Sequence, residues 1–187
     1  MSNSAENVST GKPKIAGAVF RAPKGTTAPA DATTSLAAAF KCLGYVSEDG
    51  VVNSNARSTE NIKAWGGVVV DTPVSEKSDT FKLKLIEALN MDVLAAVHGS
   101  NNVTGALATG ITVEVNDAES EEGVWVIDMI LKGNVAKRIV IPHGNITALD
   151  DVEYKDNVAI GYGITLSCMP DSSGNTHYEY IKAASTT

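Results

Sequence analysis

The chain has 187 residues, and its 15 Lys and Arg against 22 Asp and Glu give a formal net charge of −7 at pH 7. Hydrophobic residues make up 43 % of it and charged residues 20 %, which is typical of one globular domain and excludes a wholly disordered chain. Net acidity argues against a protein that holds duplex DNA through basic contacts to its phosphates. No apolar run approaches the about 20 residues of a membrane span, so we expect no membrane insertion. Two cysteines, and no secretory signal at Met1–Glu6, predict synthesis in the cytoplasm.

Both ends of the chain are polar and carry little that could be buried. Residues 1–14 are rich in Ser, Asn, Gly and Lys and are predicted to form a flexible N-terminal arm. Residues 183–187 are expected to form a short C-terminal tail. The stretch between them, residues 15–182, is predicted to fold as a single domain.

The first part of this domain mixes strand and helix signals. Residues 15–20 are apolar and typical of a strand. The spacing of apolar residues over 34–43, followed by Gly44, predicts a short helix. Residues 45–52 place two Val-containing pairs on either side of Asp49-Gly50, which predicts a β-hairpin.

Residues 53–73 lose the periodicity of their neighbours and are predicted to form a long loop. A loop of this length is uncommon inside a compact domain. One interpretation is a surface excursion that contains one extra pair of strands. The other is a segment that becomes ordered against a partner, because Ile62 and Trp65 are costly to leave in water. The residues alone leave both open.

The second half of the domain is predicted to consist mainly of strands. Residues 80–86 alternate strictly between apolar residues and lysines, which predicts a strand with one buried face. Residues 91–98 have helical spacing and end at Gly99. Further strands are expected at 111–115, 124–131, 135–141, 160–169 and 177–183. Many strands without a repeating strand–helix pattern predict a mainly β chain, an antiparallel β-sandwich or barrel with one or two short flanking α-helices.

Residues 124–141 carry the most informative pattern. Apolar side chains occupy both faces of the hairpin that these residues predict, so both faces are expected to be covered. A turn at Lys132-Gly133 would place Asp128 opposite Lys137, a favourable pair across the strands. A turn at Gly133-Asn134 would place Asp128 opposite Ile139, so the register stays open.

Catalytic and metal-binding patterns do not emerge from the sequence. His98, His143 and His177 lie on different predicted elements without neighbours at ligand spacing, and neither Cys42 nor Cys168 has the partners of a thiol enzyme. Asp117–Glu122 lacks the ligand pattern of a calcium loop and is expected to be a solvated tip between strands. We therefore expect no enzyme activity, no cofactor and no metal site.

Six segments occur in a fixed order along the chain. They are Gly44-Tyr45-Val46-Ser47-Glu48-Asp49-Gly50, Ile62-Lys63-Ala64-Trp65-Gly66-Gly67, Leu85-Ile86-Glu87-Ala88-Leu89-Asn90, Val126-Ile127-Asp128-Met129, Arg138-Ile139-Val140-Ile141-Pro142 and His177-Tyr178-Glu179-Tyr180. In this order and spacing they make the chain resemble the major tail proteins, or tail tube proteins, of long non-contractile-tailed bacteriophages, in the forms found in phages of Gram-positive bacteria. The resemblance runs from about Gly25 to Lys182.

The resemblance implies a structural virion protein of the phage tail tube fold. In this family six copies form a ring, their sheets continue into a central β-barrel, and stacked rings form a conduit for DNA delivery into the host. Residues 53–73 would then be a loop between rings, with contacts from Ile62, Lys63, Trp65, Gly66 and Gly67. The ring barrel would draw on the hairpin that carries Asp128, Lys132, Lys137 and Arg138.

The resemblance also implies the partners and the location. The chain would bind copies of itself, a tape-measure protein in the lumen, and tail terminator and distal tail proteins at the tube ends. Phage DNA would pass without specific binding, and the protein would reside in the virion. An alternative is the tube protein of a contractile injection or type VI-like secretion machine. A monomeric carbohydrate-binding module is disfavoured, because aromatic residues are only 5 % of the chain.

Overall fold

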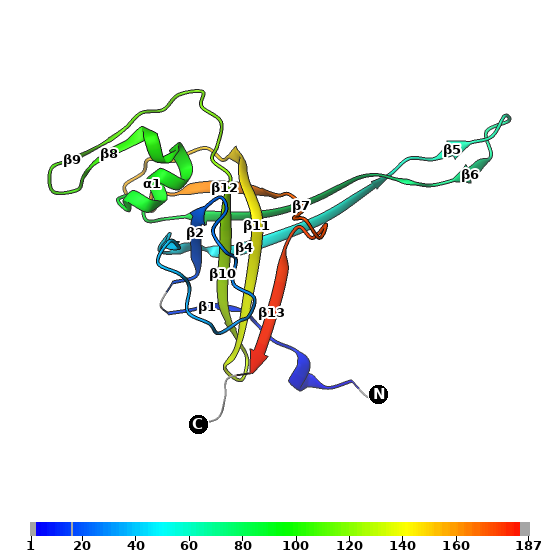
Figure 1. Ribbon diagram of the computed structural model, residues 1–187, viewed down its shortest axis with the longest axis horizontal. Helices are drawn as coiled ribbons and strands as arrows, with labels where there is room; N and C mark the ends of the chain where they lie inside the picture. The colour runs from blue at the N-terminus through cyan, green and yellow to red at the C-terminus, as the bar shows by residue number, and fades with distance from the viewer. Residues whose placement is uncertain (1–2, 16, 184–187) are drawn as a thin grey trace.

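The computed structural model describes residues 3–15 and 17–183, in which antiparallel strands dominate (Figure 1). These residues include one α-helix, α1 (Met91–His98), and two short 3-10 turns at Ala5–Asn7 and Ser100–Asn102. The strands are β1 (Lys12–Pro13), β2 (Val19–Pro23), β3 (Lys41–Cys42), β4 (Val46–Thr59), β5 (Ile62–Lys63), β6 (Val69–Asp71), β7 (Val74–Leu85), β8 (Val103–Ala106), β9 (Gly110–Val113), β10 (Gly123–Leu131), β11 (Val135–Leu149), β12 (Tyr162–Cys168) and β13 (Tyr178–Ala183). The predicted mainly β fold with a short helix is confirmed.

The hairpin of β10 and β11 is the centre of the main sheet, whose order is β3-β2-β10-β11-β12-β7-β4. Away from the hairpin turn, β2 pairs with β10 and β12 pairs with β11. Near the turn these neighbours are replaced by β1 and β13. Figure 1 shows β7 and β4 running across the direction of β10 and β11, so the sheet bends strongly around its core.

The core lies on both sides of the central hairpin, as its two apolar faces predicted. Trp125 and Ile127 of β10 belong to the larger cluster, which also includes residues of β7, β12 and α1. Val124 and Val126, on the opposite face, belong to a smaller cluster with Phe40. Because alternate residues of β10 enter different clusters, the strand is covered on both faces.

The helix α1 has the bounds that the sequence predicts. The Asn90 side-chain oxygen accepts a hydrogen bond from the Asp92 N–H at 3.0 Å and caps the first turn. Gly99, with a φ of 95°, ends the helix in a conformation that favours glycine. The helix packs into the larger core cluster through Val93, Ala96 and Val97, and not through the side that the spacing predicted, which includes Met91, Ala95 and His98.

The helix predicted over residues 34–43 is wrong. This segment is irregular up to β3, and the Asp31 carboxylate accepts hydrogen bonds from the backbone N–H groups of Thr33 and Thr34, both at 2.6 Å. Of the apolar residues that suggested a helix, Leu36 and Phe40 instead reach the smaller core cluster and Leu43 reaches the larger one. Tertiary contacts therefore override a local spacing that is compatible with a helix.

The hairpin predicted over residues 45–52 is also wrong. Val46 and Val51 both belong to β4 and face Leu85 and Leu83 of β7, so β4 bulges between them instead of turning back. Gly50, with a φ of 70°, lies in that bulge. The long partner strand β7 holds both ends of the segment in one strand.

Residues 53–73 form neither an irregular loop nor an ordered contact with the body. β4 and β7 continue beyond the body as a two-stranded ribbon, which leads to the small pair β5–β6 (Figure 1). The interpretation as a surface excursion with an extra pair of strands is the one that the structure supports. Alternation is missing from this sequence because residues 52–78 are exposed, so neither face selects apolar residues.

Inside the N-terminal segment expected to be a flexible arm, Lys12–Pro13 form the strand β1, which pairs with Met129 and Ile130 of β10. The apolar stretch at 15–20 becomes a strand only from Val19, and Ile15 is fully exposed. Backbone pairing with the edge of β10 thus orders residues that have little apolar surface of their own. The tail expected at 183–187 lies outside the described residues except for Ala183, which ends β13.

Candidate functional site

The most prominent surface feature is the long hairpin formed by residues 52–78, which projects away from the rest of the molecule (Figure 1). Its strands pair without a break from Val51–Leu83 to Ser58–Glu76. From its base to Trp65 the hairpin spans about 12 residues, or about 40 Å at ~3.3 Å per residue. A ribbon of this length can reach well beyond the surface of its own subunit.

The end of the long hairpin carries the residues predicted as ring-stacking contacts, and the structure brings them together. Ala64 donates a backbone hydrogen bond to the Val68 carbonyl at 2.8 Å, and Gly67 donates one back to the Ala64 carbonyl at 2.9 Å. Gly66 and Gly67 have φ values of 102° and 90°, which favour glycine. We call residues 62–68 the tip.

Large apolar side chains gather on the tip and beside it, and all of them face solvent. The relative exposures are 50 % for Ile62, 106 % for Trp65, 67 % for Val68, 45 % for Val69 and 61 % for Val70. Isolated exposed apolar residues are ordinary on protein surfaces, but a contiguous group that includes a fully exposed Trp marks an interaction surface.

The base of the long hairpin is fixed to the body by a buried carboxylate, Asp79, which sequence reasoning missed. Asp79 accepts hydrogen bonds from Thr176 and from the His177 ring at 2.5 Å each, and from the Asn53 amide at 2.8 Å. Burial opposes ionisation of Asp79, but these hydrogen bonds outweigh it and lower its pKa. The His177 ring also packs edge-on against Phe81, so the hairpin leaves the body from a well-defined position.

The register of the central hairpin differs from both predicted alternatives, because Asp128 faces Arg138. Leu131 pairs with Val135, which leaves a three-residue turn with left-handed φ values at Gly133 and Asn134. The Arg138 Nε and Nη2 atoms donate to the two carboxylate oxygens of Asp128 at 2.6 and 2.8 Å. Both side chains are almost completely buried.

Arg138 also ties an irregular segment to the sheet. Its Nη1 group donates to the backbone carbonyls of Asp31 and Thr34, at 3.2 and 2.8 Å. A bidentate pair with its remaining donors satisfied is the geometry in which a buried ion pair is tolerated. Of the four hairpin residues that the sequence singled out, Asp128 and Arg138 therefore act inside the subunit.

The other two hairpin residues, Lys132 and Lys137, lie near the turn. Lys132 is exposed, and its backbone N–H donates to the Ser9 hydroxyl at 2.8 Å. Lys137 forms an ion pair with Glu179 of β13, with Nζ and Oε2 2.9 Å apart. Only these two are placed where a second molecule could contact them.

Strands with only one partner among the described residues leave an edge open, and in the main sheet these are β1, β3, β4 and β13. β4 pairs only with β7, and β13 pairs only with β11. Such edges are templates for adding a strand from another chain unless they are blocked. They are therefore candidate contact surfaces in addition to the long hairpin.

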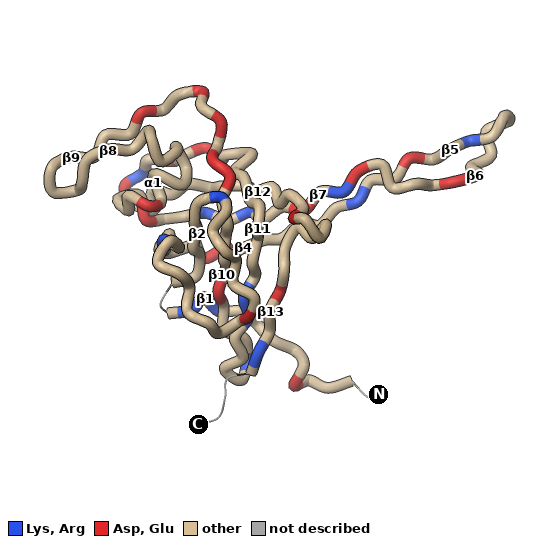
Figure 2. The backbone as a smooth tube through the Cα atoms, viewed as in Figure 1, with Lys and Arg blue, Asp and Glu red and all other residues tan. Residues whose placement is uncertain are grey.

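The acidic stretch expected to be a solvated tip, which is red in Figure 2 between β9 and β10, is partly anchored. Glu121 binds Arg21, with Nη2 and Oε2 3.2 Å apart, and Glu122 binds Lys24 at 2.6 Å. Glu122 also contacts His143 at 2.5 Å. These partners are distant in sequence, so no local signal could have identified them.

The described residues contain no group of three or more His, Cys, Asp or Glu side chains that could hold a metal ion. Cys168 is buried, and burial together with the nearby Asp79 carboxylate raises its pKa to about 12. A neutral, enclosed thiol is a poor nucleophile. The chemistry that this arrangement offers is apolar contact and strand pairing.

A family model described as phage tail tube protein matches residues 3–187. No curated protein matches the chain. In the described part of the chain, no helix is long and apolar enough to cross a membrane.

Proposed function

Since the chain belongs to the phage tail tube protein family and is a structural component of the phage tail, we propose that it forms homohexameric rings that stack into a tube for DNA delivery. The observation that carries the stacking part is the long hairpin with its exposed apolar tip. The open edges of β4 and β13 support ring formation, because a head-to-tail contact that closes on itself leaves no edge unpaired.

Contacts between rings are assigned to the tip, namely Ile62, Lys63, Trp65, Gly66 and Gly67. Covering the Trp65 side chain removes about 150–250 Å² from water, worth about 4–6 kcal/mol at ~25 cal/mol/Å². Because this area is exposed in the isolated subunit, the gain is available only on assembly. The loss of translational and rotational freedom on association opposes it.

The ring barrel is assigned to the hairpin of β10 and β11 with its exposed Lys132 and partly buried Lys137. The central hairpin already has neighbours on both sides along most of its length, with β1 and β13 outermost near the turn. A barrel built from six copies would therefore join β13 of one copy to the β1 side of the next. This arrangement would extend the sheet through every subunit of the ring.

The remaining partners belong to the same proposal. A tape-measure protein occupies the lumen, tail terminator and distal tail proteins cap the tube ends, and the subunit is made in the host cytoplasm before assembly. The net charge of −7 suits a conduit through which DNA passes without being held, because phosphate binds non-specifically to basic surfaces.

Negative-stain electron microscopy of the purified, concentrated chain tests the proposal. We expect hollow tubes, or rings with a central hole and six-fold symmetry in class averages. Monomers at every salt and protein concentration, or a closed oligomer without a bore, would contradict it.

A further inference from the structure

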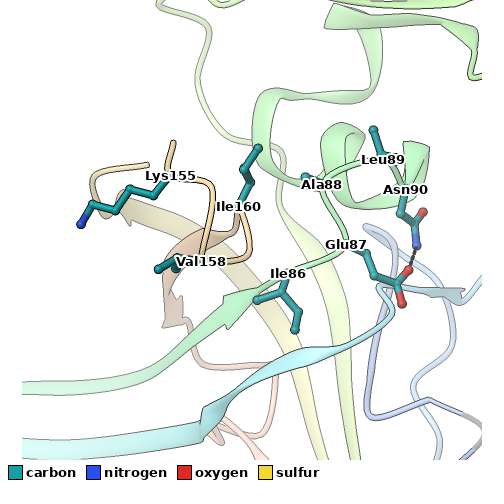
Figure 3. A pocket seen from close by; sticks show the side chains of 8 residues that line it. All are labelled: Ile86, Glu87, Ala88, Leu89, Asn90, Lys155, Val158 and Ile160. Carbon is teal, nitrogen blue, oxygen red and sulfur yellow. Dashed lines mark hydrogen bonds between the residues drawn. The ribbon is translucent and has the colours of Figure 1, made fainter. Parts of the chain in front are cut away.

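An apolar pocket lies where β7 ends and the chain approaches α1 (Figure 3). It has a volume of about 680 Å³ and is formed from two segments that are far apart in sequence, residues 86–90 and 155–160. Its apolar lining consists of Ile86, Ala88, Leu89, Val158 and Ile160. Glu87 at its edge is bound to Asn90 at 2.9 Å and to the Tyr45 N–H at 3.0 Å, so this carboxylate is not free to fill the pocket.

The pocket is lined by side chains that an isolated subunit leaves partly in water. Leu89 is 67 % exposed and Val158 is 42 % exposed. Figure 3 shows Ile86, Val158 and Ile160 close to one another, with Lys155 on the outer side. A shallow apolar surface of this size fits one bulky apolar side chain and its neighbours from another molecule.

The loop that contributes Lys155, Val158 and Ile160 to the pocket also carries acidic residues. Asp150, Asp151 and Glu153 line a separate hollow with Lys84, and Glu153 is paired with Lys155. Asp156 lies in sequence between the lining residues Lys155 and Val158 and forms no ion pair with any described residue. An apolar ligand that carries a positive charge at its side would complement this carboxylate.

The tip of the long hairpin has that chemistry. Trp65 is fully exposed, and the exposed Lys63 lies two residues away. The apolar side chains can enter the pocket while the lysine meets the carboxylate of Asp156, next to the lining residue Lys155.

The tip of one chain cannot reach its own pocket, because the two lie beyond opposite ends of the same strand. β7 separates them, and its 12 residues span about 40 Å at ~3.3 Å per residue. Figure 1 shows the tip at one extreme of the molecule and the start of α1, next to the pocket, toward the other. A contact between two different surfaces of identical chains repeats head to tail, so it generates rings or open arrays.

We propose that this pocket is the acceptor for the tip of the long hairpin of a second copy of the chain. Trp65 and Val68 pack on Leu89, Val158 and Ile160, and Lys63 pairs with Asp156. The inference rests on the proposed function, because it supplies the receiving surface for the contact between rings.

Site-specific cross-linking tests the contact directly. Ala64→Cys places a thiol beside Trp65 and Ala88→Cys places one in the pocket, while Trp65 itself is kept. With a short bis-maleimide we expect a covalent dimer when the two single variants are mixed and a ladder of multimers from the double variant. Each single variant alone and the unmodified chain, which retains Cys42 and Cys168, are the controls.

A pair of matched variants gives a second measurement. Leu89→Arg adds a bulky charge to the pocket, and Leu107→Arg makes the same change on the β8–β9 turn at nearly the same exposure, 65 % against 67 %. Leu89→Arg is expected to raise the protein concentration needed for tube formation at least tenfold, and Leu107→Arg to leave it unchanged. Circular dichroism confirms that both variants are folded.

The outcomes separate this inference from the proposed function. If the unmodified chain forms tubes, and neither the cross-link nor the selective effect of Leu89→Arg appears, the pocket is not the acceptor although the tube assignment stands. Equal loss of assembly in both Arg variants without a cross-link would overturn the pocket assignment as well. If the unmodified chain forms no tube, the proposed function fails and this inference falls with it.

Discussion

Removal of the Arg138 side chain tests the role of the buried ion pair in the central hairpin. Arg138→Ala leaves the Asp128 carboxylate buried without its bidentate partner, since the two side chains are 1 % and 5 % exposed. Breaking a buried pair from one side costs about 3–5 kcal/mol. The carbonyls of Asp31 and Thr34 also lose a donor, which adds about 0.5 kcal/mol each because water can reach these residues. We therefore expect the free energy of unfolding to fall by about 4–6 kcal/mol.

Urea denaturation followed by circular dichroism measures this loss in the unassembled subunit. With an m-value of about 2–3 kcal/mol/M, the midpoint should fall by about 2 M. Lys137→Ala is the matched control, because it removes a cation at the adjacent position whose partner Glu179 is 43 % exposed. Exposed pairs contribute about 0–1 kcal/mol, so the control midpoint should move by less than about 0.5 M. Similar shifts for the two variants would refute the reasoning.

Three further outcomes follow from the geometry. Trp65→Ala should leave the free energy of unfolding of the monomer within about 0.5 kcal/mol of the unmodified chain, because this fully exposed side chain packs on nothing in the subunit. The same variant should shorten or abolish tubes in electron micrographs, and unchanged tube length and yield would count against its stacking role. The pKa of Asp79 is lowered from 3.8 on folding, so its charge contributes stability that is present above that pH and lost as the pH falls through the lower folded-state pKa. Asp79→Asn should therefore be less stable at neutral pH, and its free energy of unfolding should fall less steeply at acidic pH than that of the unmodified chain. Curves of free energy of unfolding against pH that run parallel for the two proteins would contradict this. With its pKa raised to about 12 by burial, Cys168 should resist maleimide at pH 8 until urea is added, whereas modification of Cys168 in the native chain at the rate of Cys42 would show that it is accessible.

The elements that could be predicted from the sequence are those whose burial pattern is local. The strand over 80–86 and the helix α1 each expose one face and bury the other, and that difference determines the spacing of apolar and polar residues along the segment. The two-sided apolar pattern of 124–141 likewise indicated a hairpin covered on both faces. Ile62 and Trp65 stood out because large apolar side chains in a polar, non-periodic segment are costly to leave in water, and their contact role came from the family resemblance.

The wrong predictions share one physical cause. Residues 34–43 have helical spacing, yet the Asp31 carboxylate and the Arg138 guanidinium bind the backbone just before and at the start of this segment. Asp49-Gly50 is a good turn sequence, yet β7 offers a long edge that turns it into a bulge. In each case a partner far away in sequence competed with a weak local preference and won.

By itself, the sequence determined that the chain is mainly β and that one hairpin is covered on both faces. Only the tertiary structure decided that Asp128 faces Arg138, that Asp79 is anchored by a histidine 98 residues away, and that residues 86–90 and 155–160 meet in one pocket. Periodicity records whether a residue is buried, because burial acts on each side chain separately. Periodicity does not indicate which distant residue packs against a buried side chain, since that depends on how the strands are ordered in the sheet.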